Sequence, residues 1–281
     1  MKQNLSDLSL TAIAPIVWGS TYIVSTEFLA GFSPMTVAML RALPAGLLLL
    51  AIVRQLPAGI WWLRSFILGA LNISIFLSML FVAAYRLPGG VAGTVLSAQP
   101  LIVVILASLL LPGRLRSLAV VGALIGMIGV ALLVLTPNAT LDPIGIAAGL
   151  AGATSMAMGV TLARKWQPPV SPLTFTSWQL TTGGLLLVPV VVLFDGSIPV
   201  PTISNLMGLI WLGLIGAALT YALWFRGIGR LAPTAVSSLL FLSPLTAVLL
   251  GWVFLGQSLT VLQITGIALV ISSIWLSQRS S

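Results

Sequence analysis

The 281-residue chain contains no cysteine and no histidine, and it has only four acidic residues. The absence of cysteine excludes disulfides and cysteine metal sites. Charged residues are also scarce, at 6% of the chain against about 25% in an average soluble domain. The chain is instead apolar, with 59% hydrophobic residues and a mean hydropathy of +1.17. Such a composition cannot maintain a soluble surface, so we expect an integral membrane protein.

Ten long apolar segments follow one another, separated by short connectors that contain glycine, proline and charged residues. Each segment has close to the ~20 residues that a helix needs to cross a bilayer. None alternates polar and apolar residues as the strands of a membrane barrel do. The sequence therefore predicts an all-α membrane protein with ten transmembrane helices. We expect these helices near residues 8–27, 34–54, 64–85, 88–111, 117–136, 143–164, 172–194, 205–226, 232–256 and 259–277.

The two halves of the chain, residues 1–137 and 138–281, resemble each other. The offset between them is 138 positions up to residue 50 and 144 positions from residue 63 onward. Each half holds five predicted spans, and because five is odd the second half must enter the membrane from the opposite side. Inverted repeats of this kind place a site between the halves near the midplane, as in secondary transporters. Matching pairs are Pro34 and Pro172, Gly46 and Gly184, Phe81 and Phe225, Arg86 and Arg230, and Pro100 and Pro244.

The basic residues predict the orientation. If the N-terminus is cytoplasmic, only Arg86 falls outside and only Arg41 falls within a span. The positive-inside rule favours this arrangement, so we expect both termini in the cytoplasm. The basic residues then on the inner side are Lys2, Arg54, Arg64, Arg114, Arg116, Arg164, Lys165, Arg226, Arg230 and Arg279.

Four short motifs resemble those of the drug/metabolite transporter superfamily and, within it, the ten-span EamA-type exporters. The resemblance covers the whole chain and depends on the order of the motifs. It implies a secondary exporter of small metabolites, and the narrower likeness is to the YddG-type exporters of aromatic amino acids in bacterial inner membranes. The motifs are Trp18-Gly19-Ser20, Pro34 with Arg41, Ala98-Gln99-Pro100-Leu101, and Leu242-Ser243-Pro244-Leu245.

One feature of the family is missing. Its members commonly carry a glutamate after the fourth and ninth spans. Here those positions read Pro112-Gly113-Arg114 and Gly256-Gln257-Ser258. A role of that acid in other members therefore does not carry over to this chain.

Arg41 is the one clear ionisable residue inside a predicted span. A charge within lipid costs about 2.5–3.5 kcal/mol on insertion scales, so such a residue is a functional candidate. Its guanidinium can hold a substrate carboxylate through two parallel hydrogen bonds. The alternative is a structural role, in which Arg41 reaches the outer interface or bonds carbonyls at a helix end.

Aromatic and amide side chains recur at mid-span positions in both halves. A buried amide needs hydrogen-bond partners and is unfavourable against lipid, so we expect these residues to face the interior or a wet cavity. Any one of them could instead hold helices together, and Trp61, near a span end, is expected to anchor at the membrane interface. The candidate substrate-binding residues are Trp18, Tyr22, Arg41, Asn72, Phe76, Met79, Gln99, Trp178, Gln179, Tyr221 and Phe241.

Two further patterns concern helix packing and bending. Gly122, Gly126 and Gly129 share one face of the fifth span, where small residues allow close helix approach for packing, sliding or dimerisation.

Pro100 and Pro244 interrupt the fourth and ninth spans at equivalent positions, which frees the carbonyl four residues earlier. A matched pair of breaks favours a transport site or hinge. A fixed kink for packing is the alternative.

The missing residue types also restrict the mechanism. No span interior contains Asp, Glu, His or Lys, so no group is suited to carry protons across. No nucleotide motif, metal cluster or nucleophile–base pair is present, so we expect no cofactor, no metal and no enzyme activity.

The prediction is an inner-membrane exporter of small metabolites, with aromatic and other neutral amino acids favoured, working by alternating access. A multidrug or quaternary-cation efflux protein is one alternative, and a pore-like facilitator or lipid scrambler is another. The expected partners are the small-molecule substrate and the lipid bilayer, without nucleic acid, in a monomer or weak homodimer.

Overall fold

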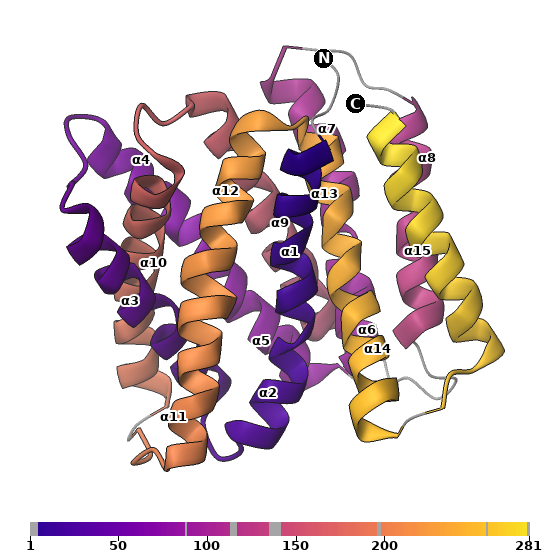
Figure 1. The fold of residues 1–281 in the computed structure, drawn as a ribbon, viewed down its shortest axis with the longest axis horizontal. Helices are drawn as coiled ribbons and strands as arrows, with labels where there is room; N and C mark the ends of the chain where they lie inside the picture. The colour runs from indigo at the N-terminus through magenta and orange to yellow at the C-terminus, as the bar shows by residue number, and fades with distance from the viewer. Residues whose placement is uncertain are drawn as a thin grey trace.

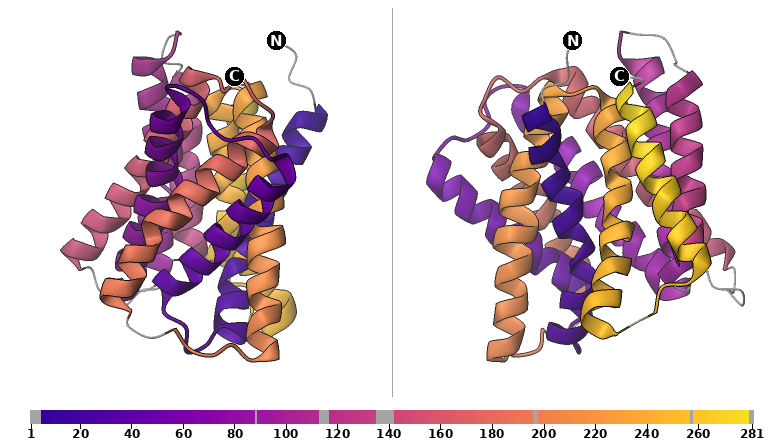
Figure 2. Two further views of the ribbon diagram at one scale, coloured as in Figure 1. Left: turned by 90° about the vertical axis from the view of Figure 1, so that its left-hand side faces the viewer. Right: turned by 45° about the vertical axis from the view of Figure 1, so that its right-hand side comes forward.

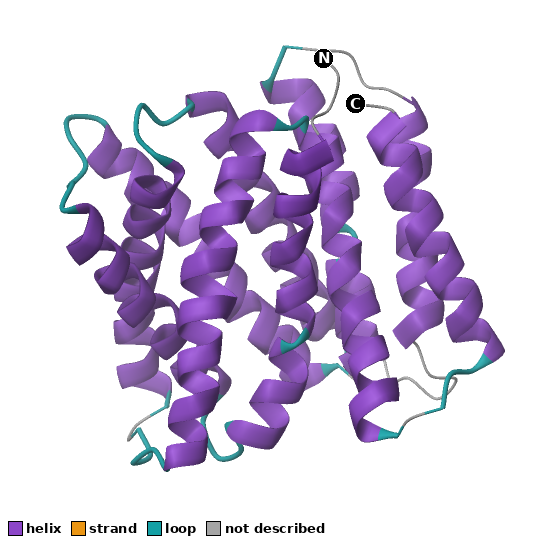
Figure 3. Ribbon diagram, viewed as in Figure 1, coloured by secondary structure: helices purple, strands orange, loops and turns teal. Residues whose placement is uncertain are grey.

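The computed structural model describes residues 5–87, 89–112, 117–134, 142–195, 198–256 and 258–279. Within these ranges every regular element is a helix and none is a strand (Figure 3). The all-α prediction is therefore confirmed. The elements in chain order are α1 (Leu5–Gly19), α2 (Thr21–Phe28), α3 (Pro34–Val53), α4 (Trp61–Gly69), η1 (Ala70–Ile75), α5 (Phe76–Arg86), α6 (Gly89–Leu96), α7 (Gln99–Leu110), α8 (Ser117–Val134), α9 (Pro143–Trp166), α10 (Pro172–Phe194), α11 (Ile203–Ile210), η2 (Trp211–Leu219), α12 (Thr220–Arg230), α13 (Pro233–Ser238), η3 (Leu239–Phe241), α14 (Leu242–Leu255) and α15 (Val261–Arg279).

These elements combine into ten stretches that are long and apolar enough to cross a membrane, counted over the described ranges. Each one overlaps a predicted span, so the ten-span prediction is confirmed. The eighth differs most, because its helix continues to Arg230 rather than ending near residue 226. Its final part carries Arg226 and, one turn later, Arg230, and both side chains form ion pairs with Asp7 on α1. The stretches are Leu5–Ser25, Pro34–Val53, Trp61–Ala83, Val91–Leu110, Ser117–Val134, Pro143–Trp166, Pro172–Phe194, Ile203–Arg230, Pro233–Phe254 and Val261–Arg279.

Helices α3 and α10 cross in close contact, and they are the second spans of the two halves (Figure 2, left). A glycine on each helix makes the crossing possible. A Cβ on Gly46 would lie 2.4 Å from the Thr181 nitrogen, and a Cβ on Gly184 would lie 2.7 Å from the Leu43 Cα. Gly46 and Gly184 are equivalents at the 138 offset, as are Leu43 and Thr181. The contact is therefore nearly the same when seen from either helix.

The two ends of this crossing are fastened by the caps of the same helices. Ser33 caps α3, and both Ser33 and Thr36 donate hydroxyl hydrogen bonds to Asp195, which follows α10. At the other end Ser171 caps α10, and the Trp178 indole nitrogen donates to the Gln55 carbonyl, 2.7 Å away, just after α3. Each helix start is thus tied to the connector that follows its partner.

Helices α8 and α15 form the other close pair, at the right of Figure 1. The predicted glycine face of the fifth span is the contact surface. A Cβ on Gly129 would lie 2.9 Å from the Val270 nitrogen, and one on Gly126 would lie 2.5 Å from the Ser273 hydroxyl oxygen. The glycines therefore serve helix packing, which is the first of the roles predicted for them.

Helix α1 packs against α12 and α14, and its counterpart α9 packs against α5 and α7. The first span of each half therefore packs against the third and fourth spans of the other half, as expected for two related five-helix units. The predicted unit boundary between residues 137 and 138 lies outside the described residues, so the division into 1–137 and 138–281 stays a prediction. Helix α1 begins and α15 ends at the same end of the molecule (Figure 1), as an even number of spans requires.

Candidate functional site

Two spans lose regular α-helical geometry near their middles. Residues 70–75 (η1) in the third span and 211–219 (η2) in the eighth are π-helical. A shift of 144 places 70–75 on 214–219, so the irregular segments are at equivalent positions. π-Helical turns are rare and are frequent at functional sites. Each segment carries a buried polar centre.

The first centre is the Gly216 carbonyl in η2. Three side chains donate hydrogen bonds to this one oxygen: the Arg41 guanidinium at 2.9 Å, the Trp18 indole nitrogen at 3.1 Å and the Thr220 hydroxyl at 2.8 Å. Trp18 also donates to the Thr220 oxygen at 2.9 Å. Arg41 is buried, with 9% of its surface exposed, and the Gly216 carbonyl is its only partner among the described residues. Arg41 therefore does not reach the outer interface. It bonds a backbone carbonyl, which is close to the other form of the structural role predicted for it, and substrate binding stays a prediction.

The second centre joins Asn72 of η1 to Gln179 of α10. The Asn72 amide nitrogen donates to the Gln179 side-chain oxygen at 2.7 Å, and both side chains are fully buried. The remaining atoms of the pair, Asn72 Oδ1 and Gln179 Nε2, have no hydrogen-bond partner. Flipping both amides exchanges these roles but still leaves one free acceptor and one free donor. Buried polar atoms without partners are uncommon and cost free energy.

The two centres are related by the repeat. Gln179 is the equivalent of Arg41 at the 138 offset, and Gly216 is the equivalent of Asn72 at the 144 offset. In each centre a side chain of the crossing helices α3 or α10 reaches a π-helical segment of the other half. One centre carries a positive charge and the other is neutral. The sequence predicted Arg41, Asn72 and Gln179 as candidates but not Gly216, and it did not predict which groups would meet.

An aromatic chain connects Trp18 to Trp178. Ring centroids are 5.1 Å apart for Trp18–Tyr221, 5.8 Å for Tyr221–Phe225 and 5.3 Å for Phe225–Phe175. Phe175 then contacts Trp61 at 6.2 Å, and Trp61 contacts Trp178 at 6.3 Å. All except the partly buried Trp18 and Trp61 are buried in one apolar core.

The sequence analysis missed three members of this chain. Phe175 and Phe225 were not predicted as candidates, and Trp61 was expected to anchor at the interface. The spacing contained a signal, because Phe175 lies three residues before Trp178 and Phe225 four residues after Tyr221. Both spacings place the pair on one helix face.

The remaining candidates do not all join this cluster. Phe241 packs between α8 and α15 in a separate core, against Gly126. Met79, on α5, packs against α9 beside Gly152. Phe76 packs at the edge of the central core. Gln99 is buried, and its side-chain nitrogen has no partner. The Tyr22 side chain lies outside the described residues.

A groove of about 270 Å³ between α3 and α11–η2 is apolar and contains none of the predicted binding residues. Leu40, Pro44 and Gly213 are among its lining residues. It lies at span depth, and its lining suits lipid or apolar solutes.

The fourth and ninth spans are irregular where the prolines predicted it. Helix α6 ends at Leu96, and α7 begins at Gln99 with Pro100 in its first turn. In the other half a short 3₁₀ segment, 239–241, precedes Pro244. The offset of 144 maps the break at 97–98 onto 241–242, so it overlaps the end of the 3₁₀ segment.

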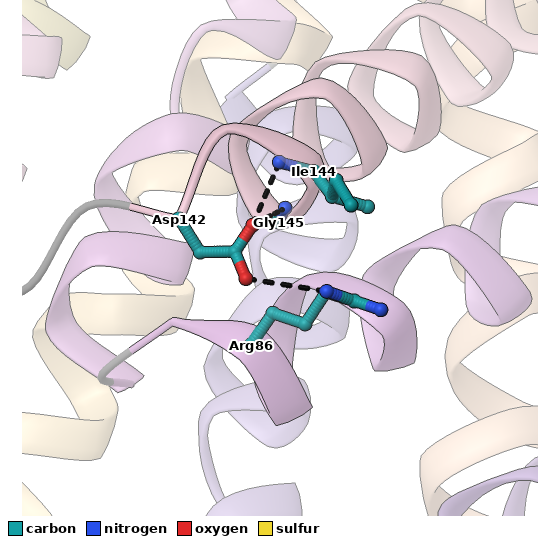
Figure 4. Close-up of polar contacts among 4 residues, drawn as sticks. All are labelled: Arg86, Asp142, Ile144 and Gly145. Carbon is teal, nitrogen blue, oxygen red and sulfur yellow. Dashed lines mark hydrogen bonds and ion pairs between the residues drawn. The ribbon is translucent and has the colours of Figure 1, made fainter.

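Ion pairs join two pairs of helices at their ends. Asp7 at the start of α1 binds Arg226 at 2.6 Å and Arg230 at 3.4 Å, and the Asp7 side chain is only 11% exposed. Asp142, which caps α9, binds Arg86 at the end of α5 at 3.2 Å (Figure 4). Hydrogen bonds from the Gly145 amide, and then from Ile144 and Arg86, lower the pKa of Asp142 below its ordinary value. Arg86 and Arg230 are repeat equivalents, and by span count the two ion pairs lie at opposite ends of the bundle.

Within the described residues, no group of three or more acidic, histidine or cysteine side chains is placed to hold a metal ion. Ten apolar spans that enclose buried polar centres are the architecture of a multi-pass membrane carrier. The chain belongs to the EamA-like transporter family, whose profile matches residues 6–135 and again 143–278. It is thus a transporter of that family, which implies a small-molecule substrate and a lipid environment.

Known relatives extend along nearly the whole chain. Protein PecM of Dickeya dadantii is 45% identical over 270 residues, covering 95% of this chain and 91% of PecM. The uncharacterized inner membrane transporter YedA of Escherichia coli is 27% identical, covering 92% of this chain and 86% of YedA. A solved crystal structure with 20% identity superimposes with a TM-score of 0.83 and covers 98% of both chains, which shows the fold.

Proposed function

We propose that this protein is an inner-membrane secondary exporter of small metabolites, with aromatic and other neutral amino acids as favoured substrates. The observation that carries the proposal is the pair of buried polar centres at equivalent mid-span positions. Asn72, Gln99 and Gln179 retain unused hydrogen-bonding atoms in spans where lipid offers no partner. A polar solute supplies such partners, and the adjoining aromatic chain suits an apolar side group.

Alternating access accounts for the matched irregularities. Carriers with inverted repeats bind substrate near the midplane and open by moving parts of one half against the other. Equivalent π-helical segments and equivalent proline irregularities give each half the same points of flexibility. The Asp7 and Asp142 ion pairs close the α1–α12 and α9–α5 contacts at opposite ends. We infer that each opens when its end of the carrier opens.

The cellular arrangement belongs to the same proposal. The YedA relative is described as an inner membrane transporter, which supports a bacterial inner-membrane location. The charge distribution supports cytoplasmic termini. The chain works without enzyme activity, as a monomer or weak homodimer in two five-helix halves, 1–137 and 138–281.

Transport across proteoliposome membranes tests the carrier mechanism. Purified protein is reconstituted, the vesicles are loaded with unlabelled phenylalanine, and entry of labelled phenylalanine is followed. A carrier gives faster labelled entry when the unlabelled amino acid is inside, because exchange avoids the return of the empty protein. Uptake that rises linearly with concentration and is not stimulated by internal substrate contradicts the proposal and favours a pore.

A further inference from the structure

We infer that Trp18, Arg41 and Thr220 form an anion subsite that binds the carboxylate of the transported solute and excludes cationic solutes. This inference rests on the proposed function, because it specifies which chemical group of the substrate the first polar centre binds.

The charge of Arg41 has no protein counter-ion. The chain has four acidic residues, and all four are described. Asp7 binds Arg226 and Arg230, and Asp142 binds Arg86. Asp195 accepts hydroxyl hydrogen bonds from the start of α3, and Glu27, which is exposed near the end of α2, forms no ion pair with Arg41. Among the described residues, the buried guanidinium is therefore left with a backbone carbonyl as its one partner.

The hydrogen-bond inventory gives the same result. A guanidinium has five N–H donors, and Arg41 uses one of its nitrogens on the Gly216 carbonyl. The Thr220 hydroxyl also donates to that oxygen, and the Trp18 N–H is shared between it and the Thr220 oxygen. The other N–H groups of Arg41 have no acceptor among the described residues, and an acceptor with negative charge would satisfy both these donors and the charge. A carboxylate matches the planar fork of arginine with two parallel hydrogen bonds.

The second polar centre, formed by Asn72 and Gln179, carries no charge that would favour an anion. Asn72 and Gln179 together leave one donor and one acceptor, and neither is charged. The two centres therefore differ in what they select, although they are equivalent in the repeat. A positive solute group beside Arg41 meets like-charge repulsion in a medium of low dielectric constant. The buried Arg41 therefore disfavours quaternary cations as substrates.

Three phenyl compounds separate the charge requirements. 3-Phenylpropionate has a carboxylate without an ammonium group, phenylalanine has both, and phenethylamine has an ammonium group without a carboxylate. Dissociation constants are measured on the purified protein by titration calorimetry and checked by thermal shift. We expect both carboxylates to bind at least about tenfold more tightly than phenethylamine.

The variants assign that preference to Arg41. Arg41→Gln should weaken binding of both carboxylates about tenfold or more, and Arg41→Lys should restore part of the affinity because it keeps the charge but not the fork. Trp18→Phe keeps the ring and removes the N–H, so it should weaken carboxylate binding less. Arg54→Gln removes an exposed positive charge from the end of the same helix and should leave all three constants unchanged. If Arg41→Gln does not fold, Arg41→Lys and Trp18→Phe still test the subsite.

Several results overturn the inference. They are equal binding of phenethylamine and 3-phenylpropionate to the wild type, no carboxylate binding by the wild type, or undiminished carboxylate binding by the Arg41 variants. Transport measurements distinguish this failure from failure of the proposed function. Flux of phenethylamine without flux of either carboxylate leaves the carrier in place and removes the anion subsite. Carboxylate binding that depends on Arg41 but gives no flux leaves the subsite in place and removes the carrier.

Discussion

Gly159 controls how closely α9 approaches the neutral polar centre. A Cβ at this position would lie 2.1 Å from the Asn72 side-chain oxygen. The amide pair with Gln179 thus depends on a missing side chain on a third helix, as well as on its own hydrogen bond.

Gly159→Ala is expected to displace Asn72 and weaken its hydrogen bond to Gln179. Overpacking of this kind typically costs about 1–3 kcal/mol, so the melting temperature in detergent should fall. Phenylalanine counterflow should fall with it. The matched control is Gly229→Ala on α12, where a new Cβ meets nothing within 4 Å. Alanine favours the helix there by up to about 1 kcal/mol. Equal melting temperatures for Gly159→Ala and wild type contradict the packing argument.

At the scale of helices, close contact has two different causes. The α3–α10 and α8–α15 pairs approach through glycine, so dispersion between backbones holds them in lipid. The α1–α12 and α5–α9 pairs also have glycine contacts, at Gly227 and Gly152, and in addition ion pairs join them at their ends. Ion pairs near water can separate and re-form, whereas glycine contacts tolerate little change in distance. We therefore expect the first two pairs to stay together during transport and the ion-paired ends to open.

Asp7→Asn should destabilise the protein and shift it toward the state open at the end that carries the termini. It leaves the half-buried Arg226 and the exposed Arg230 without their shared counter-ion, at a cost of about 1–3 kcal/mol. Thermal unfolding gives the stability. Accessibility of a cysteine placed at Thr11, which is fully buried on the face of α1 toward Gly227, reports the opening.

The control for this change is Asp142→Asn. Asparagine still caps α9, and the Arg86 partner is exposed, so the melting temperature should fall less than in Asp7→Asn. A larger fall in melting temperature for Asp142→Asn than for Asp7→Asn contradicts the expectation that the buried Asp7 ion pairs contribute more to stability than the exposed Asp142–Arg86 pair.

On the scale of the whole molecule, the positions of the chain ends and the charges determine orientation. Both described chain ends lie at one end of the helix bundle. The connector containing Ala58 lies at that same end by span count, and the connector containing Ala30 lies at the other. The natural chain has no cysteine, so single cysteines can be read without a background signal.

Labelling with a membrane-impermeant maleimide should therefore give opposite results at these two exposed positions. Ala30→Cys should react in intact spheroplasts, because its connector is predicted to face outward. Ala58→Cys should react only after permeabilisation. Reaction of Ala58→Cys in intact spheroplasts, with protection of Ala30→Cys, contradicts the predicted orientation.

Energy coupling is also a property of the whole chain. An obligate proton antiporter needs a group that titrates while its access changes sides, and histidine or a desolvated carboxylate normally supplies it. The chain has no histidine, and Asp7 is the one acid buried in the bundle, where two arginines hold it. We expect substrate to move down its own gradient without stoichiometric proton exchange.

Proteoliposomes with an imposed pH gradient at zero membrane potential provide the measurement. The pH gradient alone should not drive concentrative phenylalanine uptake. Uptake that it does drive, and that Asp7→Asn or Glu27→Gln abolishes, identifies the proton carrier and contradicts this prediction. Glu27 is included because its side chain lies near a span end.

Several features of the protein follow from its sequence alone, because they depend on local chemistry. The number and type of spans follow from the length of the apolar runs, since lipid allows only a fully hydrogen-bonded helix there. The irregularities near Pro100 and Pro244 follow from the missing proline N–H. The glycine spacing on α8 indicated its packing face. Each of these depends on residues within a single helix.

The tertiary structure alone decided which buried groups meet. No pattern in the sequence paired Arg41 with the Gly216 carbonyl, because glycine gives no side-chain signal and the carbonyl is exposed only by a π-helical turn. Phe241 has the same chemistry as Phe175, yet helix rotation places one against α8 and α15 and the other in the central aromatic chain. Hydrophobicity determines that a side chain is buried between helices. The close packing of the crossing helices, determined by where glycines allow contact, decides what it touches.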